Sequence, residues 1–154
     1  LTEKIGQKNY IRDYIKSYQL FFGLISLLFF SVSCLFSESI LLLFGEEYVP
    51  YSDSFLILIF GIIGIFIFRS IYGNLLSSIG KMTINYYIVS IAIVLNIISN
   101  LYLIPIYGIK GAAITTSTLM WLTGISSWIC FNYQFKKTKT IKASKTSLGD
   151  DTTI

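Results

Sequence analysis

The stretch FLILIFGIIGIFIF, residues 55–68, contains no charged or hydrogen-bonding side chain. It lies within an apolar span over about 54–78, which meets Arg69 and ends before Gly80 and Lys81. A run of this length is typical of a membrane-crossing helix, because ~20 residues rising ~1.5 Å each cover the ~30 Å hydrocarbon core. A membrane strand needs only ~10 residues of alternating polarity, and no such alternation is present.

Three further apolar spans surround this one, at about 17–36, 83–104 and 110–133. The whole chain is 54% hydrophobic and 13% charged, whereas a soluble domain carries about 25% charged residues. The charges gather at the ends of the chain and in the gaps between spans. The sequence therefore predicts an all-α fold, a multi-pass transmembrane bundle of four helices covering 17–133.

The segments outside the spans predict the remaining organisation. Residues 1–16 are polar and have the spacing of an amphipathic helical lead-in, and 37–53 form an acidic gap with an apolar middle. That middle is too short to span, so it either lies at the interface or extends the first helix. The lysine-rich segment 134–154 has few apolar residues, which predicts a disordered basic cytoplasmic tail.

A tight turn is expected between the third and fourth spans. Pro105 cannot donate to a helix hydrogen-bond ladder, and Gly108 and Gly111 permit a sharp reversal. Two long helices joined by so few residues must be antiparallel neighbours.

The loop charges predict the orientation. Basic residues precede the first span and fill the tail, the 37–53 gap is acidic, and only Lys110 lies on the unexpected side. Cytoplasmic loops carry an excess of Lys and Arg, so both termini are expected in the cytoplasm. This placement also favours a topological role for the net charge of +4 over nucleic-acid binding.

Arg69 is the most informative residue, because a charge at the bilayer centre costs about 2.5–3.5 kcal/mol on insertion scales. Such residues usually face a bundle interior or an aqueous path. The alternative is snorkelling, in which the long side chain lifts its guanidinium to the headgroups. Polar neighbours at three- and four-residue spacing favour a polar face: Ser70, Gly73, Asn74, Ser77 and Lys81. This face either lines a cationic groove suited to an anionic substrate or, for Asn74 and the serines above all, forms hydrogen bonds to a neighbouring helix.

A second polar group lies on the third span, where Asn96 and Asn100 are one turn apart. An asparagine in lipid needs a partner, so this side is expected to face protein or water, either for packing or along a substrate path. The spans hold no Asp or Glu, and the chain has no histidine and two cysteines without metal-ligand spacing. Neither an enzyme site, a metal site nor a cofactor site is therefore predicted.

Two segments carry a family resemblance: LFGEEYVPYSDSFLIL, residues 43–58, and NIISNLYLIPIYGIKGAAITT, residues 96–116, with NLLSSIGK, residues 74–81, between them. Their order resembles the C-terminal part of polysaccharide (O-antigen type) flippases of the multidrug/oligosaccharidyl-lipid/polysaccharide exporter superfamily. The Gly-Lys turn and the element Ile-Pro-x-x-Gly-x-x-Gly-Ala-Ala match that pattern.

The resemblance implies a larger two-lobed transporter fold of twelve or more helices around a central cavity. It implies the transfer of undecaprenyl-pyrophosphate-linked oligosaccharide repeat units across the bacterial cytoplasmic membrane, with membrane lipid and a missing first lobe as partners. Four helices are too few for such a cavity, so the chain is expected to be a C-terminal fragment. Two alternatives stay open: a flippase relative with a drug or peptidoglycan precursor as cargo, and a small non-transporting membrane partner protein.

Overall fold

The computed structural model describes the backbone of residues 8–149 and the side chains of residues 13–135. Every regular element in this part of the chain is helical, which confirms the predicted all-α fold. The elements in chain order are α1 Lys8–Leu42, the 3₁₀-helix η2 Glu46–Tyr51, α2 Ser52–Gly64, the π-helix η3 Ile65–Arg69, α3 Ser70–Ser78, α4 Met82–Tyr107 and α5 Ile109–Gly149.

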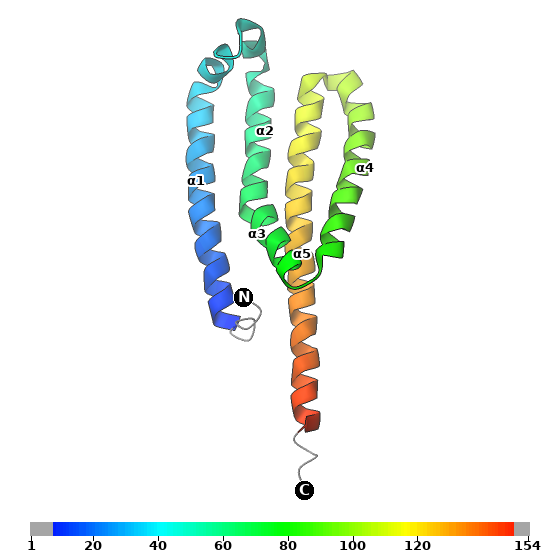
Figure 1. Ribbon diagram of the computed structural model, residues 1–154. Coiled ribbons are helices and arrows are strands. Elements are labelled where there is room, and N and C mark those ends of the chain that lie inside the picture. Colours follow the sequence, from blue (N-terminus) through cyan, green and yellow to red (C-terminus); the bar gives the residue numbers. More distant parts are fainter. Residues whose placement is uncertain (1–7, 150–154) are drawn as a thin grey trace.

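The helices stand side by side in the order α1, α2, α5, α4 (Figure 1). Helix α5 packs against both α2 and α4, and α1 packs against the far side of α2. The α1–α2 connection and the α4–α5 turn lie at one end of the bundle, and the α3–α4 turn lies toward the other (Figure 1). The chain therefore runs up and down through the bundle.

Three of the described helical segments are long and apolar enough to cross a membrane: Asp13–Leu42, Glu46–Ser78 and Met82–Tyr107. The fourth predicted span, 110–133, is not among them, although it forms the first part of α5. Its threonines, serines and glycines lower its hydropathy, and many of them face neighbouring helices. The described part of the chain thus has three strongly apolar spans and a fourth, more polar helix that packs between two of them.

The second span is not one continuous helix. Helix α2 ends at Gly64, a π-helical turn covers Ile65–Arg69, and α3 continues to Ser78 at an angle to α2 (Figure 1). The first span also deviates, because Phe36 has non-helical dihedrals of φ −122° and ψ 17° within α1. Beyond this kink α1 continues to Leu42, so part of the acidic gap extends the first helix, and the 3₁₀-helix η2 follows.

Glycines make the two turns that enclose α4. Gly80 has φ 73°, and the N–H groups of Gly80 and Lys81 bond the carbonyls of Ser77 and Leu76, a Schellman motif that ends α3. Gly108, with φ 59°, is the single residue between α4 and α5. Pro105 lies within the last turns of α4, so it does not break the helix as its chemistry suggested.

Gly111 has a steric role in the same turn. A Cβ atom at this position would lie 2.4 Å from the backbone oxygen of Leu103 on α4. The close antiparallel contact of α4 and α5 therefore needs glycine here.

The tail differs from the sequence expectation. We expect disorder over 134–154, but α5 continues as helix to Gly149. Extending a helix that has already formed requires ordering only one residue at a time and no new nucleation step. The composition of the tail does not show that it follows such a helix. Residues 1–7 of the lead-in and 150–154 of the tail lie outside the described residues.

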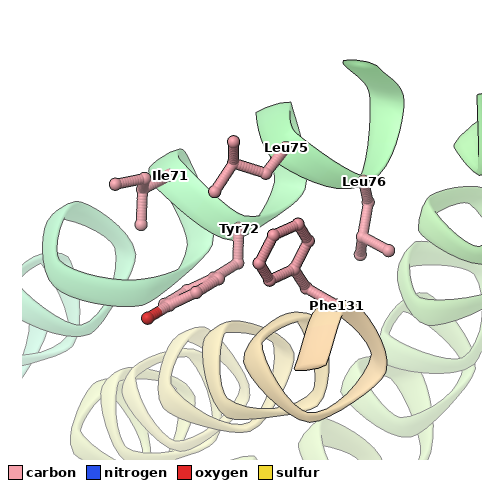
Figure 2. Packing of buried hydrophobic residues seen from close by; sticks show 5 residues of the cluster. All are labelled: Ile71, Tyr72, Leu75, Leu76 and Phe131. Carbon is pink, nitrogen blue, oxygen red and sulfur yellow. The ribbon is translucent and has the colours of Figure 1, made fainter. Parts of the chain in front are cut away.

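The core lies around α3. Ile71, Tyr72, Leu75 and Leu76 are buried together with Phe131 of α5, and Leu76 has no exposed surface. Figure 2 shows the Phe131 ring between the side chains of Tyr72 and Leu76, with the Tyr72 and Phe131 ring centroids 5.7 Å apart. This cluster fixes α3, and with it Arg69, against α5.

Candidate functional site

Close packing of α2 on α5 brings Arg69 to its position. A Cβ atom on Gly61 would lie 2.7 Å from the Cα of Ser117, and one on Gly64 would lie 2.8 Å from the Trp121 ring. Small residues of this kind let membrane helices approach closely. The π-helical turn follows directly, and Arg69 is its last residue.

The guanidinium of Arg69 bonds to two other helices. Nη1 donates to Oγ of Ser127 on α5 at 2.8 Å and to Oδ1 of Asn85 on α4. Ser127 is fully buried, and its hydroxyl in turn donates to the Thr123 carbonyl at 2.8 Å. Arg69 itself is half-buried, so its charge is held inside the helix bundle.

The α3 backbone completes this arrangement, which we call the Arg69 cluster (Arg69, Gly73, Asn85 and Ser127). Nδ2 of Asn85 donates to the Gly73 carbonyl at 3.2 Å. A Cβ atom on Gly73 would lie 3.0 Å from Nη1 of Arg69, so glycine leaves the space that the guanidinium occupies.

The Arg69 cluster contains no acid. The sequence has no Asp or Glu between Asp53 and Asp150, and among residues 13–135 the recorded ion pair joins Lys110 to Asp53, at 2.9 Å. The acceptors around Arg69 are an amide and a hydroxyl, which carry no charge. The cluster therefore retains a net positive charge within a span.

Helix α1 contacts the same region from the opposite side. Nε2 of Gln19 donates to the Ile67 carbonyl in the π-helical turn at 3.3 Å and to the Tyr72 hydroxyl at 3.4 Å. A π-helical turn shifts the backbone bonding pattern, and Gln19 supplies an extra donor where this shift occurs.

The predicted asparagines form a second polar site. Nδ2 of Asn100 donates to Oδ1 of Asn96 at 3.0 Å. Oδ1 of Asn100 and Oγ1 of Thr115 are buried and have no hydrogen-bond partner within the described part of the chain. Asn96 is eleven residues beyond Asn85 on α4, about 16 Å along the helix, so this pair is separate from the Arg69 cluster.

An open apolar groove of about 110 Å³ lies between these two polar sites, where α4 meets α5. Its lining includes Ile88 and Leu95 from α4 and Leu119 and Leu122 from α5.

The structure divides the predicted groove residues. Arg69 lies in the cluster, but Asn74 and Lys81 have exposed side chains and do not bond to it. Sequence reasoning missed Asn85 and Ser127 as partners of Arg69. A signal for Asn85 was available, because it shares the polar side of the third span with Asn96 and Asn100.

The described residues hold no group of three or more His, Cys, Asp or Glu side chains that could bind a metal ion. Cys34 is exposed, Cys130 is half-buried, and both are free thiols. Arg69 is a cation held by uncharged acceptors, and such a group attracts anions.

The chain is similar in sequence to a known membrane protein. The chain is 40% identical over 84 residues to the uncharacterized membrane protein MJ1068 of Methanocaldococcus jannaschii. That alignment covers 53% of this chain and 16% of the relative, so the chain matches a small part of a much longer protein. No solved structure matches.

The MatE family model matches residues 2–102, which include α1, the broken second span and most of α4. Members of this family are membrane transporters rather than enzymes. The chain therefore belongs to the MatE family of the multidrug/oligosaccharidyl-lipid/polysaccharide exporter superfamily.

Proposed function

We propose that this chain is the C-terminal part of a flippase that moves undecaprenyl-pyrophosphate-linked oligosaccharide repeat units across the cytoplasmic membrane for surface polysaccharide and O-antigen synthesis. One observation carries the proposal: Arg69 lies in a span, is held by neutral acceptors, and has no acid in the sequence between Asp53 and Asp150. A cation in that state favours an anionic ligand, and a guanidinium suits phosphate oxygens because it forms bidentate hydrogen bonds.

In this mechanism the whole transporter alternates between inward-open and outward-open states. Arg69 receives the pyrophosphate, and Asn96 and Asn100 contact the sugar or stabilise the packing of α4. Asn74 and Lys81, whose side chains are exposed, would contact the cargo nearer the membrane surface. The missing first lobe would supply the other wall of the cavity.

The positive charge also bears on the alternative cargoes. A cationic drug is repelled by Arg69, whereas a peptidoglycan precursor carries the same pyrophosphate as the proposed cargo. Complementation of two strains, one lacking its polysaccharide flippase and one lacking its peptidoglycan-precursor flippase, distinguishes these cargoes. Rescue of the second strain alone would overturn the assignment to surface polysaccharide.

The decisive test is Arg69→Leu in the full-length protein, with Arg69→Lys as the matched variant that keeps the charge. A hydrogen bond to a charged group contributes about 1.5–3 kcal/mol, so we expect export to fall roughly ten- to a hundredfold in Arg69→Leu and less in Arg69→Lys. Surface glycan is measured at equal protein levels in a strain lacking its own flippase. Wild-type export by Arg69→Leu contradicts the proposal.

We also propose that both termini are cytoplasmic. The Lys110–Asp53 ion pair supports this, because it neutralises the one basic residue on the unexpected side. In a cysteine-free background, Glu47→Cys should react with a membrane-impermeant maleimide on intact cells, and Met82→Cys should not. The reverse labelling pattern would contradict this orientation.

A further inference from the structure

We propose that Asn85 is a positioning residue for Arg69: it fixes the guanidinium through a neutral acceptor, so that the site keeps its positive charge for a phosphate group. This inference rests on the proposed function, in which Arg69 receives the phosphate of the cargo. It adds the residue that sets both the geometry and the charge of that site.

The geometry points to Asn85 because both the oxygen and the nitrogen of its amide form hydrogen bonds in the Arg69 cluster. Oδ1 accepts from Nη1 of Arg69, and Nδ2 donates to the Gly73 carbonyl at 3.2 Å. An amide side chain can accept through its oxygen and donate through its nitrogen at the same time. Asn85 therefore connects the guanidinium of the π-helical turn to the backbone of α3 and to α4.

Both protein bonds use one nitrogen of the guanidinium. Nη1 donates to Asn85 and to Ser127, while a guanidinium has five N–H donors in a fixed fork. The donors on Nε and Nη2 form no hydrogen bond with the described residues, so this edge remains for a ligand. A phosphate group accepts from such an edge in a bidentate manner.

Because residue 85 is an amide and not a carboxylate, the Arg69 cluster keeps its net positive charge. Aspartate at position 85 would have almost the same shape, but it would bring a negative charge to Nη1. The resulting ion pair would hold Arg69 in place and neutralise it. Asn85→Asp should therefore keep the fold and lose the phosphate preference, whereas a residue with only a structural role would not separate these two properties.

The test uses the full-length protein in nanodiscs of phosphatidylcholine, titrated with undecaprenyl phosphate and with undecaprenol. The Kd for undecaprenol divided by the Kd for undecaprenyl phosphate isolates the contribution of the phosphate group to binding. The melting temperature of each variant shows whether it is folded. We expect Asn85→Asp to lower this ratio about tenfold, because a phosphate bound to the neutralised Arg69 loses about as much as one hydrogen bond to a charged group contributes. The melting temperature should stay close to the wild-type value, because the ion pair with Arg69 offsets the lost bond to the Gly73 carbonyl. Asn132→Asp is the matched control, because Asn132 is an exposed asparagine on α5.

Two further variants keep the result decisive if Asn85→Asp does not fold. Asn85→Leu removes the acceptor without adding charge and should lower the ratio, and Asn85→Gln should restore part of it. A wild-type ratio in folded Asn85→Asp or Asn85→Leu overturns the inference.

Arg69→Leu separates this inference from the proposed function. If Arg69→Leu keeps the phosphate preference, Arg69 is not the phosphate site and the proposed function loses its support. If Arg69→Leu loses the preference while folded Asn85 variants keep it, the proposed function stands and Asn85 has no positioning role.

Discussion

Helices α3 and α4 meet at the Gly80 turn but differ in how they are buried. Helix α3 is short and contains one asparagine and three serines, yet Ile71, Tyr72, Gly73, Leu75 and Leu76 are all buried. Helix α4 is far longer and more apolar, and none of its residues is buried. Burial in this molecule therefore does not follow apolarity.

The physical reason for this difference in burial is that the surrounding solvent is lipid rather than water. Lipid tails are as apolar as leucine, so apolar surface alone gives membrane helices no reason to associate. Helices pack where small residues allow close approach and where polar groups bond between them, as the Arg69 cluster does between η3, α3, α4 and α5. The following predictions test this contrast between the packed region around α3 and the open face of α4.

The largest effect is expected for Leu76→Ala, because Leu76 has no exposed surface. Removing a buried leucine costs about 2–5 kcal/mol, in part through the cavity that remains. Leu101→Ala is the matched control, since Leu101 on α4 is 69% exposed. Thermal unfolding of the full-length protein in detergent measures both. Equal destabilisation by the two variants would break the contrast and would mean that other helices of the transporter cover α4.

Gly61→Leu should have the next largest effect. Its Cβ atom would lie 2.7 Å from the Ser117 backbone, so α2 and α5 would have to separate, and overpacking of this kind costs about 1–3 kcal/mol. Gly23→Leu on α1 makes the same change where nothing lies within 4 Å of the new Cβ. A stable Gly61→Leu protein with an unchanged melting temperature would contradict the close packing of α2 on α5.

A smaller loss is expected for Ser127→Ala, which removes one acceptor of the Arg69 guanidinium. Hydrogen bonds between membrane helices contribute about 0.6 kcal/mol on average and up to ~1.7. Ser126→Ala changes the adjacent, half-buried serine and should have less effect on unfolding. If Ser126→Ala is the more damaging variant, the bond from Arg69 to Ser127 does not contribute to stability.

The smallest effect is expected at the exposed Lys110–Asp53 ion pair. Exposed pairs are screened and contribute little, so Lys110→Ala should leave the melting temperature unchanged at moderate salt. A double-mutant cycle with Asp53→Ala isolates the interaction. A clear coupling between the two positions would show that this end of the bundle is also tightly organised.

The apolar runs were sufficient to predict the helical fold, and the glycines at 80 and 108 marked where α4 begins and ends. Hydropathy reports only the composition of a segment, so it did not predict that the fourth span packs between α2 and α4. The continuation of α5 to Gly149 was also not apparent from composition.

The Arg69 site was predicted only in part, for a geometric reason. Asn74 is five residues beyond Arg69 and therefore about 140° around helix α3 from it, and Lys81 follows the turn at Gly80 that ends this helix. Both side chains are exposed for these reasons. Ser127 is distant in sequence, and nothing in one chain's spacing connects it to Arg69.

A single residue, Gly108, separates α4 from α5. A translocon releases segments into lipid according to their apolarity, and the 110–133 segment is the least apolar of the four predicted spans. Because only one residue connects the two helices, α5 cannot remain in water while α4 enters the bilayer. The two helices have to insert together as one hairpin, and the apolarity of α4 then carries α5, with the buried Ser127, into the membrane.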